Sequence, residues 1–182
     1  MNDLVTRVGP WRIERVLGRD LSGSYLVGRR DDGERAVLYL PTGELATVRR
    51  ERLARLVDQH RGLGHPGLVR FRELAHDHGD VYLVADPVDD ALASLRGGRP
   101  ALGQIRGLGA ALAGALAAAH DAGVVHGGLD LDNTLWAPGR PPQVLGAGVA
   151  ALDMADHVAP AHGDVAALGR LLCALLAAHP AR

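Results

Sequence analysis

Lysine is absent from this chain of 182 residues. Lysine and arginine together number 20, and all 20 are arginine. Because the arginine guanidinium stays protonated in proteins, enzymes that use a lysine amine as nucleophile or to form a Schiff base are excluded. The same absence excludes P-loop nucleotide binding, in which a lysine contacts the phosphates.

Cysteine and long apolar runs are scarce as well. The one cysteine, Cys173, has no partner for an internal disulfide, which is typical of proteins from a reducing compartment. The longest apolar stretch, 165–178, contains Arg170 and is shorter than the about 20 residues that cross a bilayer. Residues 1–10 lack the apolar run of a signal peptide. We therefore expect a cytoplasmic protein with no membrane partner, and a buried Cys173.

Neither sign of charge dominates the chain. The 20 basic and 21 acidic residues give a net charge of −1, which excludes nucleic-acid binding driven by bulk positive charge. Hydrophobic residues make up 47% and charged residues 23%, as in ordinary soluble proteins. The length suffices for about one domain with a real core.

The order of the predicted elements favours an α+β fold. A helix is expected at 47–59 within the first half, and apolar residues at helical spacing predict helices at 102–122 and 164–178 in the second. Strands are expected in the first half at 11–17, 25–27, 36–40, 68–74 and 81–84, and in the second at 134–136 and 143–145. This pattern predicts a five-stranded antiparallel sheet with one helix, followed by a mainly helical half.

Three segments carry a resemblance to a known family. Segment 124–133 reads Val-Val-His-Gly-Gly-Leu-Asp-Leu-Asp-Asn, in which His126, Leu129 and Asn133 fit the kinase pattern H-R-D-L-x-x-x-N. Gly146-Ala147-Gly148 stands where D-F-G is expected, and 159–161 reads Ala-Pro-Ala in place of A-P-E. With the element order, these residues resemble the bacterial eukaryotic-type (Hanks-type) Ser/Thr protein kinases over nearly the whole chain.

The resemblance implies a two-lobe fold. Residues 1–87 would form the N-lobe, and 88–182 a truncated C-lobe that ends at its central helix. His126 and Asp164 match positions that brace the catalytic loop in this family, and they are implied here as structural residues.

The positions that react or bind metal are replaced. Tyr39 stands at the lysine position, Gly128 at the catalytic aspartate and Gly146 at the metal-binding aspartate. Glycine neither accepts a proton nor binds magnesium, so no catalytic residue, metal or cofactor is expected. The resemblance therefore implies a catalytically inactive pseudokinase that acts as a protein-binding or regulatory module in bacterial signalling.

Two alternatives stay open at this stage. One is a nucleotide-binding switch that needs no metal and binds ATP through residues that match the family's nucleotide pocket. Those residues are Gly18, Gly23, Asp86, Val88 and Asn133. The other is a divergent Ser/Thr kinase with residual ATP-dependent phosphotransfer.

The final helix is the expected partner surface. With no later helices to cover it, its outer side would expose Leu171, Leu172, Leu175 and Leu176. Exposed apolar patches of this size usually mark an interface. We expect a homodimer or a protein partner there, such as an active kinase or a phosphopeptide-reading protein, and no nucleic acid.

Overall fold

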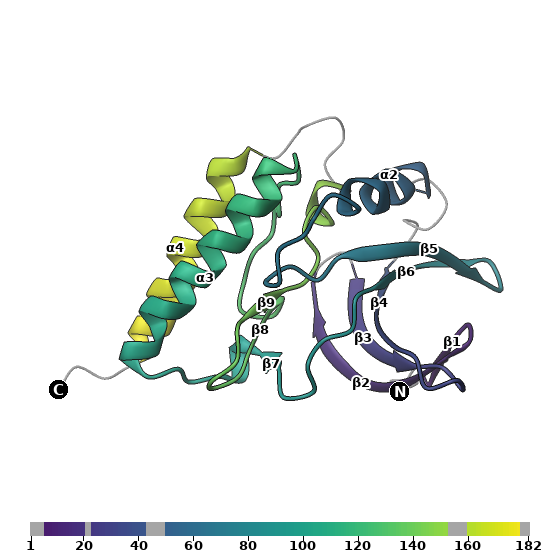
Figure 1. Ribbon diagram of the computed structural model, residues 1–182, viewed down its shortest axis with the longest axis horizontal. Coiled ribbons are helices and arrows are strands. Elements are labelled where there is room, and N and C mark those ends of the chain that lie inside the picture. The colour runs from purple at the N-terminus through teal and green to yellow at the C-terminus, as the bar shows by residue number, and fades with distance from the viewer. Residues whose placement is uncertain (1–5, 21–22, 43–49, 153–159, 179–182) are drawn as a thin grey trace.

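The computed structural model describes residues 6–20, 23–42, 50–152 and 160–178 (Figure 1). The fold is α+β, with a curled antiparallel sheet and one covering helix on one side and two long antiparallel helices on the other. The α+β class predicted from the sequence is therefore confirmed.

The main sheet has six strands, so the prediction of five strands is wrong. All neighbours are antiparallel, in the order β1-β2-β3-β4-β6-β5. The bounds are β1 (Arg7–Val8), β2 (Trp11–Arg19), β3 (Gly23–Arg29), β4 (Arg35–Pro41), β5 (Phe71–Asp77) and β6 (Asp80–Ala85). The missed strand is β1, which is two residues long and pairs with the start of β2. Two residues are too few to show an alternating pattern.

Tight turns set the register of the hairpins. Between β3 and β4, Gly33 has a φ of 90°, and the Asp32 carboxylate accepts a hydrogen bond of 2.9 Å from the Glu34 amide. Positive φ favours glycine and a short polar side chain can replace a backbone hydrogen-bond acceptor, so this local sequence fixes the turn. Between β5 and β6, His78 and Gly79 both have positive φ.

One predicted strand starts later than expected. The pattern predicted a strand over 68–74, but β5 begins at Phe71. Leu68 instead forms an isolated parallel bridge with Val144. This bridge ties the segment before β5 to the second half of the chain.

Helix α2 (Arg50–His60) covers one face of the sheet, as Figure 1 shows. It buries Leu53, Leu56 and Val57 on one side, which is the helical spacing seen in the sequence. Residues 47–49 of the predicted helix lie outside the described residues.

The second half contains a small sheet and the two long helices. β7 (Ala93–Ser94), which the sequence did not predict, pairs with β8, and β8 pairs with β9. The other bounds are β8 (Thr134–Trp136), β9 (Gln143–Val144), the short helices η1 (Leu95–Gly97) and η2 (Ala150–Leu152), α3 (Leu102–Asp121) and α4 (Ala161–Ala177). Both predicted long helices are confirmed, with α4 starting three residues before the predicted 164.

Two apolar clusters form most of the core. The larger lies between the main sheet and α2 and includes Leu135, Leu145 and Val149 from the second half. The other holds α3 against α4 through residues such as Leu112 and Leu171. The first cluster therefore draws on both sides of residue 87, and the division of the chain at that residue stays a prediction.

A third cluster fills the inside of the sheet's curl. It contains Trp11, Leu38 and Tyr82. The Arg30 guanidinium lies 4.2 Å from the centre of the Trp11 ring and covers this cluster with a cation–π contact. Both faces of the sheet are therefore packed.

The final helix exposes fewer leucines than the sequence predicted. Leu171 and Leu175 are only 3% and 5% exposed because this side of α4 packs against α3. Leu172 is half-buried and Leu176 is 48% exposed. Cys173 is exposed, so the prediction that it is buried is wrong as well.

Helix α3 is long and apolar enough to cross a bilayer by length and composition alone. In the structure, 39% of its most apolar window is buried in the molecule. Core helices of soluble proteins share this character, and the described residues are compatible with a soluble protein.

Truncating the leucines of α4 will separate its packed side from its open side. Leu171→Ala should lower the free energy of unfolding by about 2–5 kcal/mol, because it leaves a cavity against α3. Leu176→Ala should cost less than about 1 kcal/mol, because its side chain is half in solvent. Denaturant unfolding of both variants measures the difference. Equal losses would contradict the packing of α4 described above.

Candidate functional site

Asp164 braces the loop that joins α3 to β8. Its carboxylate accepts hydrogen bonds from the backbone amides of His126 and Gly127, both at 2.8 Å. His120 Nε2 lies 2.8 Å from the same carboxylate. Asp164 is 1% exposed, so these three contacts replace the water that a buried carboxylate needs. Gly127 has a φ of 78°, which suits the loop to glycine at this point.

The second part of this loop is held by its own polar groups. The Asn133 side chain accepts a hydrogen bond from the Asp130 amide at 2.9 Å and donates one to the Gly128 carbonyl at 2.7 Å. The Asp130 carboxylate accepts from the amides of Asp132 and Asn133. Asn133 is 3% exposed and uses both ends of its amide within the loop. It is therefore turned inward rather than toward a ligand.

Two buried histidines hold the segment around Gly146. His60 Nδ1 accepts from the Phe71 amide at 3.0 Å, so Nε2 carries the proton that it donates to the Ala147 carbonyl at 2.9 Å. His126 repeats this arrangement, because its Nδ1 accepts from the Gly128 amide and its Nε2 donates to a neighbouring carbonyl. Burial lowers the pKa of both histidines, and that of His60 falls to about 4. Both rings are therefore neutral near pH 7.

Tyr25 from β3 fills the space beside Gly146. A Cβ atom at Gly146 would lie 1.9 Å from the Tyr25 hydroxyl oxygen, and Gly146 has a φ of 75°. The Tyr25 hydroxyl donates a 2.7 Å hydrogen bond to the Asp20 carboxylate. Burial first, and then the charge of Asp20, raise the pKa of Tyr25 well above its ordinary value. No aspartate side chain fits at position 146 while Tyr25 occupies this place.

Tyr39 lies in the core under the sheet. It is fully buried, and its ring centre lies 4.8 Å from that of Tyr25 and 6.2 Å from that of Phe71. A Cβ atom at Gly23 would lie 2.6 Å from the Tyr39 ring. The position predicted to match the kinase lysine is thus occupied by one member of a buried aromatic cluster.

The end of β2 touches the loop between α3 and β8. A Cβ atom at Gly18 would lie 2.5 Å from the Asp132 carbonyl oxygen. Gly18 therefore permits a close approach of backbone to backbone that any other residue would block. Of the predicted nucleotide-pocket residues, Gly18 makes this contact and Asn133 follows Asp132 in the loop, whereas a Cβ atom at Gly23 would meet the Leu40 carbonyl oxygen and the Tyr39 ring.

The two remaining pocket residues lie in the linker that follows β6. The Asp86 amide donates to the Arg70 carbonyl at 2.9 Å, and the Asp86 carboxylate binds the Arg70 guanidinium at 2.7 Å. Val88 is 7% exposed and belongs to the core cluster under the sheet. Both residues already have partners within the protein.

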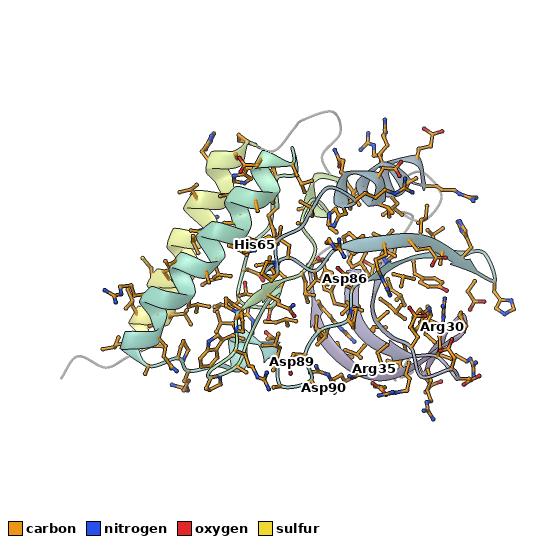
Figure 2. All side chains as sticks on the ribbon, viewed as in Figure 1. Arg30, Arg35, His65, Asp86, Asp89 and Asp90 are labelled. Atoms are coloured by element: carbon orange, nitrogen blue, oxygen red, sulfur yellow. The ribbon has the colours of Figure 1, made fainter. Side chains whose placement is uncertain are left out.

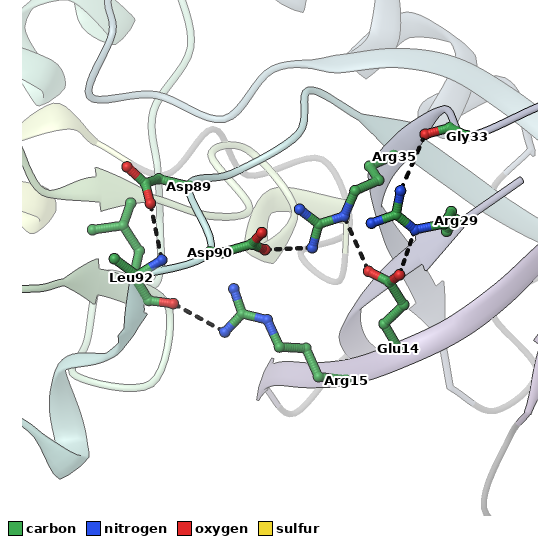
Figure 3. Close-up of polar contacts among 9 residues, drawn as sticks. Glu14, Arg15, Arg29, Gly33, Arg35, Asp89, Asp90 and Leu92 are labelled. Atoms are coloured by element: carbon green, nitrogen blue, oxygen red, sulfur yellow. Dashed lines mark hydrogen bonds and ion pairs between the residues drawn. The ribbon is translucent and has the colours of Figure 1, made fainter.

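Arginines from other elements hold the rest of this linker, whose aspartates are labelled in Figure 2. Figure 3 shows that Arg35 bridges the linker to Glu14, which also binds Arg29. The linker contacts are Asp90 with Arg35, Asp89 with Arg140 at 3.3 Å, and the Leu92 carbonyl with Arg15 at 3.0 Å. Exposed pairs contribute only about 0–1 kcal/mol each, so their combined effect is to fix the path of the linker.

Metal ligands do not gather in the part of the chain that the structure describes. Within those residues, no group of three or more histidine, cysteine, aspartate or glutamate side chains could hold an ion. His126 and Asp164, which the family resemblance suggested as structural residues, are both buried, and both bind backbone groups, while Asp164 also contacts the His120 ring.

Sequence reasoning missed Tyr25 and His60. Tyr25 was treated only as part of a strand, although the chain has just three tyrosines and one phenylalanine. The sequence did offer one signal for the Tyr25 contact. A large residue, Tyr25, follows Gly23, and a glycine stands at position 146. For His60, the signal is a histidine on the apolar side of a predicted helix.

Acid should destabilise the protein through the buried histidines. His60 takes up a proton near pH 6.5 when unfolded but only near pH 4 when folded. Its contribution is therefore complete above pH 6.5 and is lost as the pH falls toward 4, by roughly 3 kcal/mol in total. His126 acts in the same direction. Denaturant unfolding between pH 7.5 and 4 measures the loss, which His60→Gln should reduce. A profile that is flat over this range would contradict the described burial.

A side chain at position 146 should be poorly tolerated. Gly146→Ala adds a Cβ that collides with the Tyr25 hydroxyl and also forces alanine to a φ of 75°, so stability should fall by at least about 2 kcal/mol. Thermal and denaturant unfolding measure the change.

Two variants separate collision from strain at this position. Gly139 has a φ of 73° and open space around it, so Gly139→Ala should show the strain alone. Tyr25→Phe removes the nearest atom, so Gly146→Ala should cost less in that background. Equal costs at positions 139 and 146, with no coupling to Tyr25, would mean that the ring does not fill this space.

Comparison with known proteins does not identify a family for this chain. No family model matches the chain, and no curated protein matches it. The functional argument therefore rests on the residues of this site alone.

Proposed function

We propose that this protein is a pseudokinase, a kinase-like fold without phosphotransfer that acts as a protein-binding or regulatory module. One observation carries the proposal. The loop from His126 to Asn133 keeps its bracing contacts to Asp164, whereas positions 39, 128 and 146 carry no group that could perform the chemistry.

Loss of the catalytic groups should lower the rate of phosphoryl transfer by a large factor. A protein kinase depends on a lysine at the phosphates, a base at the hydroxyl and a carboxylate on magnesium. A positioned base alone contributes typically ~10²–10⁴ in rate. If each of the three losses cost only ~10², a turnover of ~10 s⁻¹ would fall to ~10⁻⁵ s⁻¹, although such effects do not strictly add. Asp130, the nearest carboxylate in the loop, accepts two backbone amides through Oδ1 and caps the loop.

The contacts between the two halves weigh against nucleotide binding as the function. Tyr25 lies against Gly146, and Gly18 lies against the Asp132 carbonyl. A nucleotide between these segments would have to separate both contacts. These contacts therefore favour a protein-binding module over a metal-independent nucleotide switch as the function.

These contacts hold the two halves of the molecule together, and this closed arrangement favours a function that depends on the protein surface. The linker from Asp86 to Leu92 is bound by arginines from several elements. A fixed relation between the halves suits a module that presents one shape to a partner, and an active kinase or a phosphopeptide-reading protein is the class of partner that we propose.

Calorimetry with ATP, with and without magnesium, tests the proposal on the full chain. We expect no heat of binding at millimolar ATP and no transfer of labelled phosphate above a heat-inactivated control. Binding without magnesium would replace the module with the nucleotide switch. Magnesium-dependent binding with turnover would restore the enzyme and overturn the proposal.

Two tyrosine variants show whether occlusion is the cause. Tyr25→Phe removes the bond to Asp20 and keeps the ring, so it should remain without ATP binding. Tyr25→Ala removes the ring and is the variant in which weak binding is expected, provided that circular dichroism shows it folded. Binding by Tyr25→Phe but not by Tyr25→Ala would contradict occlusion by the ring.

A further inference from the structure

Arginines oppose one another across the first four strands of the main sheet. Arg7 of β1 pairs with Arg12 of β2, Arg12 pairs with Arg29 of β3, and Arg29 pairs with Arg35 of β4. Residues paired in this way point to the same face of a sheet. Because neighbouring strands lie about 4.8 Å apart, these four residues, the arginine row, form a line of positive charge about 14 Å long.

The arginine row lies on the outside of the curled sheet. The neighbouring pairs contain Val8, Trp11 and Ala36, which belong to the apolar cluster inside the curl. Successive residues of a strand point to opposite faces, so the arginines point away from this cluster. Arg7 and Arg12, at one end of the row, are exposed.

The fold does not account for this repetition of one charge. Like charges directly opposite each other destabilise a pair of strands. Threonine is equally suited to a strand position and carries no charge. A row of four arginines therefore has a cost in stability that the sheet itself does not require.

One half of the arginine row already holds a carboxylate, as Figure 3 shows. Glu14 lies at a shift of register in the pairing of β2 with β3. Its carboxylate accepts hydrogen bonds from Arg29 Nε at 2.6 Å and from Arg35 Nε at 3.0 Å. The hydrogen bond from Arg29 is the main cause that lowers the pKa of Glu14 below its ordinary value. Two neighbouring arginines of the row thus bind one carboxylate between them.

The other half of the row has no carboxylate in this position. Arg12 has no hydrogen bond or ion pair within the described residues. Arg7 donates to the Gly9 carbonyl at 3.2 Å and lies 3.7 Å from the carboxylate of Asp31, whose side chain is 91% exposed. An exposed ion pair of this kind contributes little and is readily exchanged. Positive charge therefore remains uncompensated at this end of the row.

We propose that Arg7 and Arg12 form a docking site for an acidic segment of a protein partner. A carboxylate of that segment would lie between the two guanidinium groups, as Glu14 lies between Arg29 and Arg35. Guanidinium groups bind carboxylates through paired, charge-assisted hydrogen bonds. The inference names the chemistry of the partner, and it rests on the proposed function as a protein-binding module.

The amount of open charge favours a peptide over a nucleic acid. Nucleic-acid binding driven by phosphates commonly uses about 6–10 cationic contacts. Only Arg7 and Arg12 of the row are open, because Arg29 and Arg35 hold Glu14. A short acidic segment matches this charge.

Peptide titration of the full chain tests the docking site. The probe is a fluorescent decapeptide of alternating serine and glutamate, and a decapeptide of serine and glutamine is the uncharged comparison. The acidic peptide should bind with a Kd at or below about 1 mM at about 20 mM salt, and about tenfold more salt should weaken it severalfold through screening. Equal binding of the two peptides, or no binding of either, would overturn the proposal.

Charge variants place the binding on the arginine row. Arg12→Glu should weaken binding of the acidic peptide at least tenfold, because it removes one guanidinium and adds a repelling carboxylate. Glu14→Gln should instead strengthen binding about threefold or more, because it frees Arg29 and Arg35 to extend the site. Circular dichroism shows that each variant is folded. Unchanged affinity in Arg12→Glu would contradict the assignment.

Arg19→Glu is the matched control. Arg19 is an exposed arginine at the other end of the same strand, and it has no hydrogen bond or ion pair within the described residues. Its reversal changes the net charge of the chain by the same amount as Arg12→Glu and should alter the affinity less than about twofold. Equal weakening by the two variants would mean that the peptide responds to bulk charge and would overturn the site.

Two further measurements exclude other occupants. Tighter binding of a ten-nucleotide oligothymidylate than of the acidic peptide would assign the row to nucleic acids. A dimer in sedimentation equilibrium that Arg12→Glu abolishes would assign it to a second copy of the chain. Either result would overturn the proposal.

ATP calorimetry tests the proposed function separately from the docking site. A chain that binds neither the acidic peptide nor ATP would overturn the docking site and leave the pseudokinase. Peptide binding together with magnesium-dependent ATP turnover would leave the docking site and overturn the pseudokinase.

Discussion

The packing of the Tyr25 ring against Gly146 is the contact on which the closed arrangement of the protein depends. The ring leaves no room for a side chain at position 146, and its hydroxyl donates a hydrogen bond to Asp20, which follows β2. The same ring also contacts Tyr39, whose ring centre lies 4.8 Å away with the two planes tilted by 39°. Gly146 has a positive φ and no side chain, so its backbone can adopt this conformation and still leave room for the Tyr25 ring.

Polar groups near this contact are turned toward the protein. Asp164 serves two backbone amides and His120, Asn133 closes its own loop, and the two buried histidines bind carbonyls on either side of Gly146. These contacts preserve the shape of the loop. A site of this kind stabilises a fold and presents a surface, which is why the proposed role is binding rather than catalysis.

Local patterns in the sequence predicted much of the fold but little of the packing. The helices and most strands followed from apolar spacing and turn residues, whereas β1 and β7 are two residues long and show no pattern. The exposure of the final helix was predicted wrongly for Leu171 and Leu175, because periodicity does not say which side α3 covers. The positions expected to match catalytic residues were placed by spacing alone, and that assignment stays a prediction. The Tyr25 contact joins segments about 120 residues apart, and no local pattern reports it.

A crystal structure of the chain grown with a non-hydrolysable ATP analogue and magnesium would test the central claim most directly. The account predicts the Tyr25 hydroxyl on Asp20, its ring against Gly146, and no nucleotide between β2 and the loop that follows α3. A nucleotide seated there, with Tyr25 displaced and magnesium held by protein carboxylates, would contradict it.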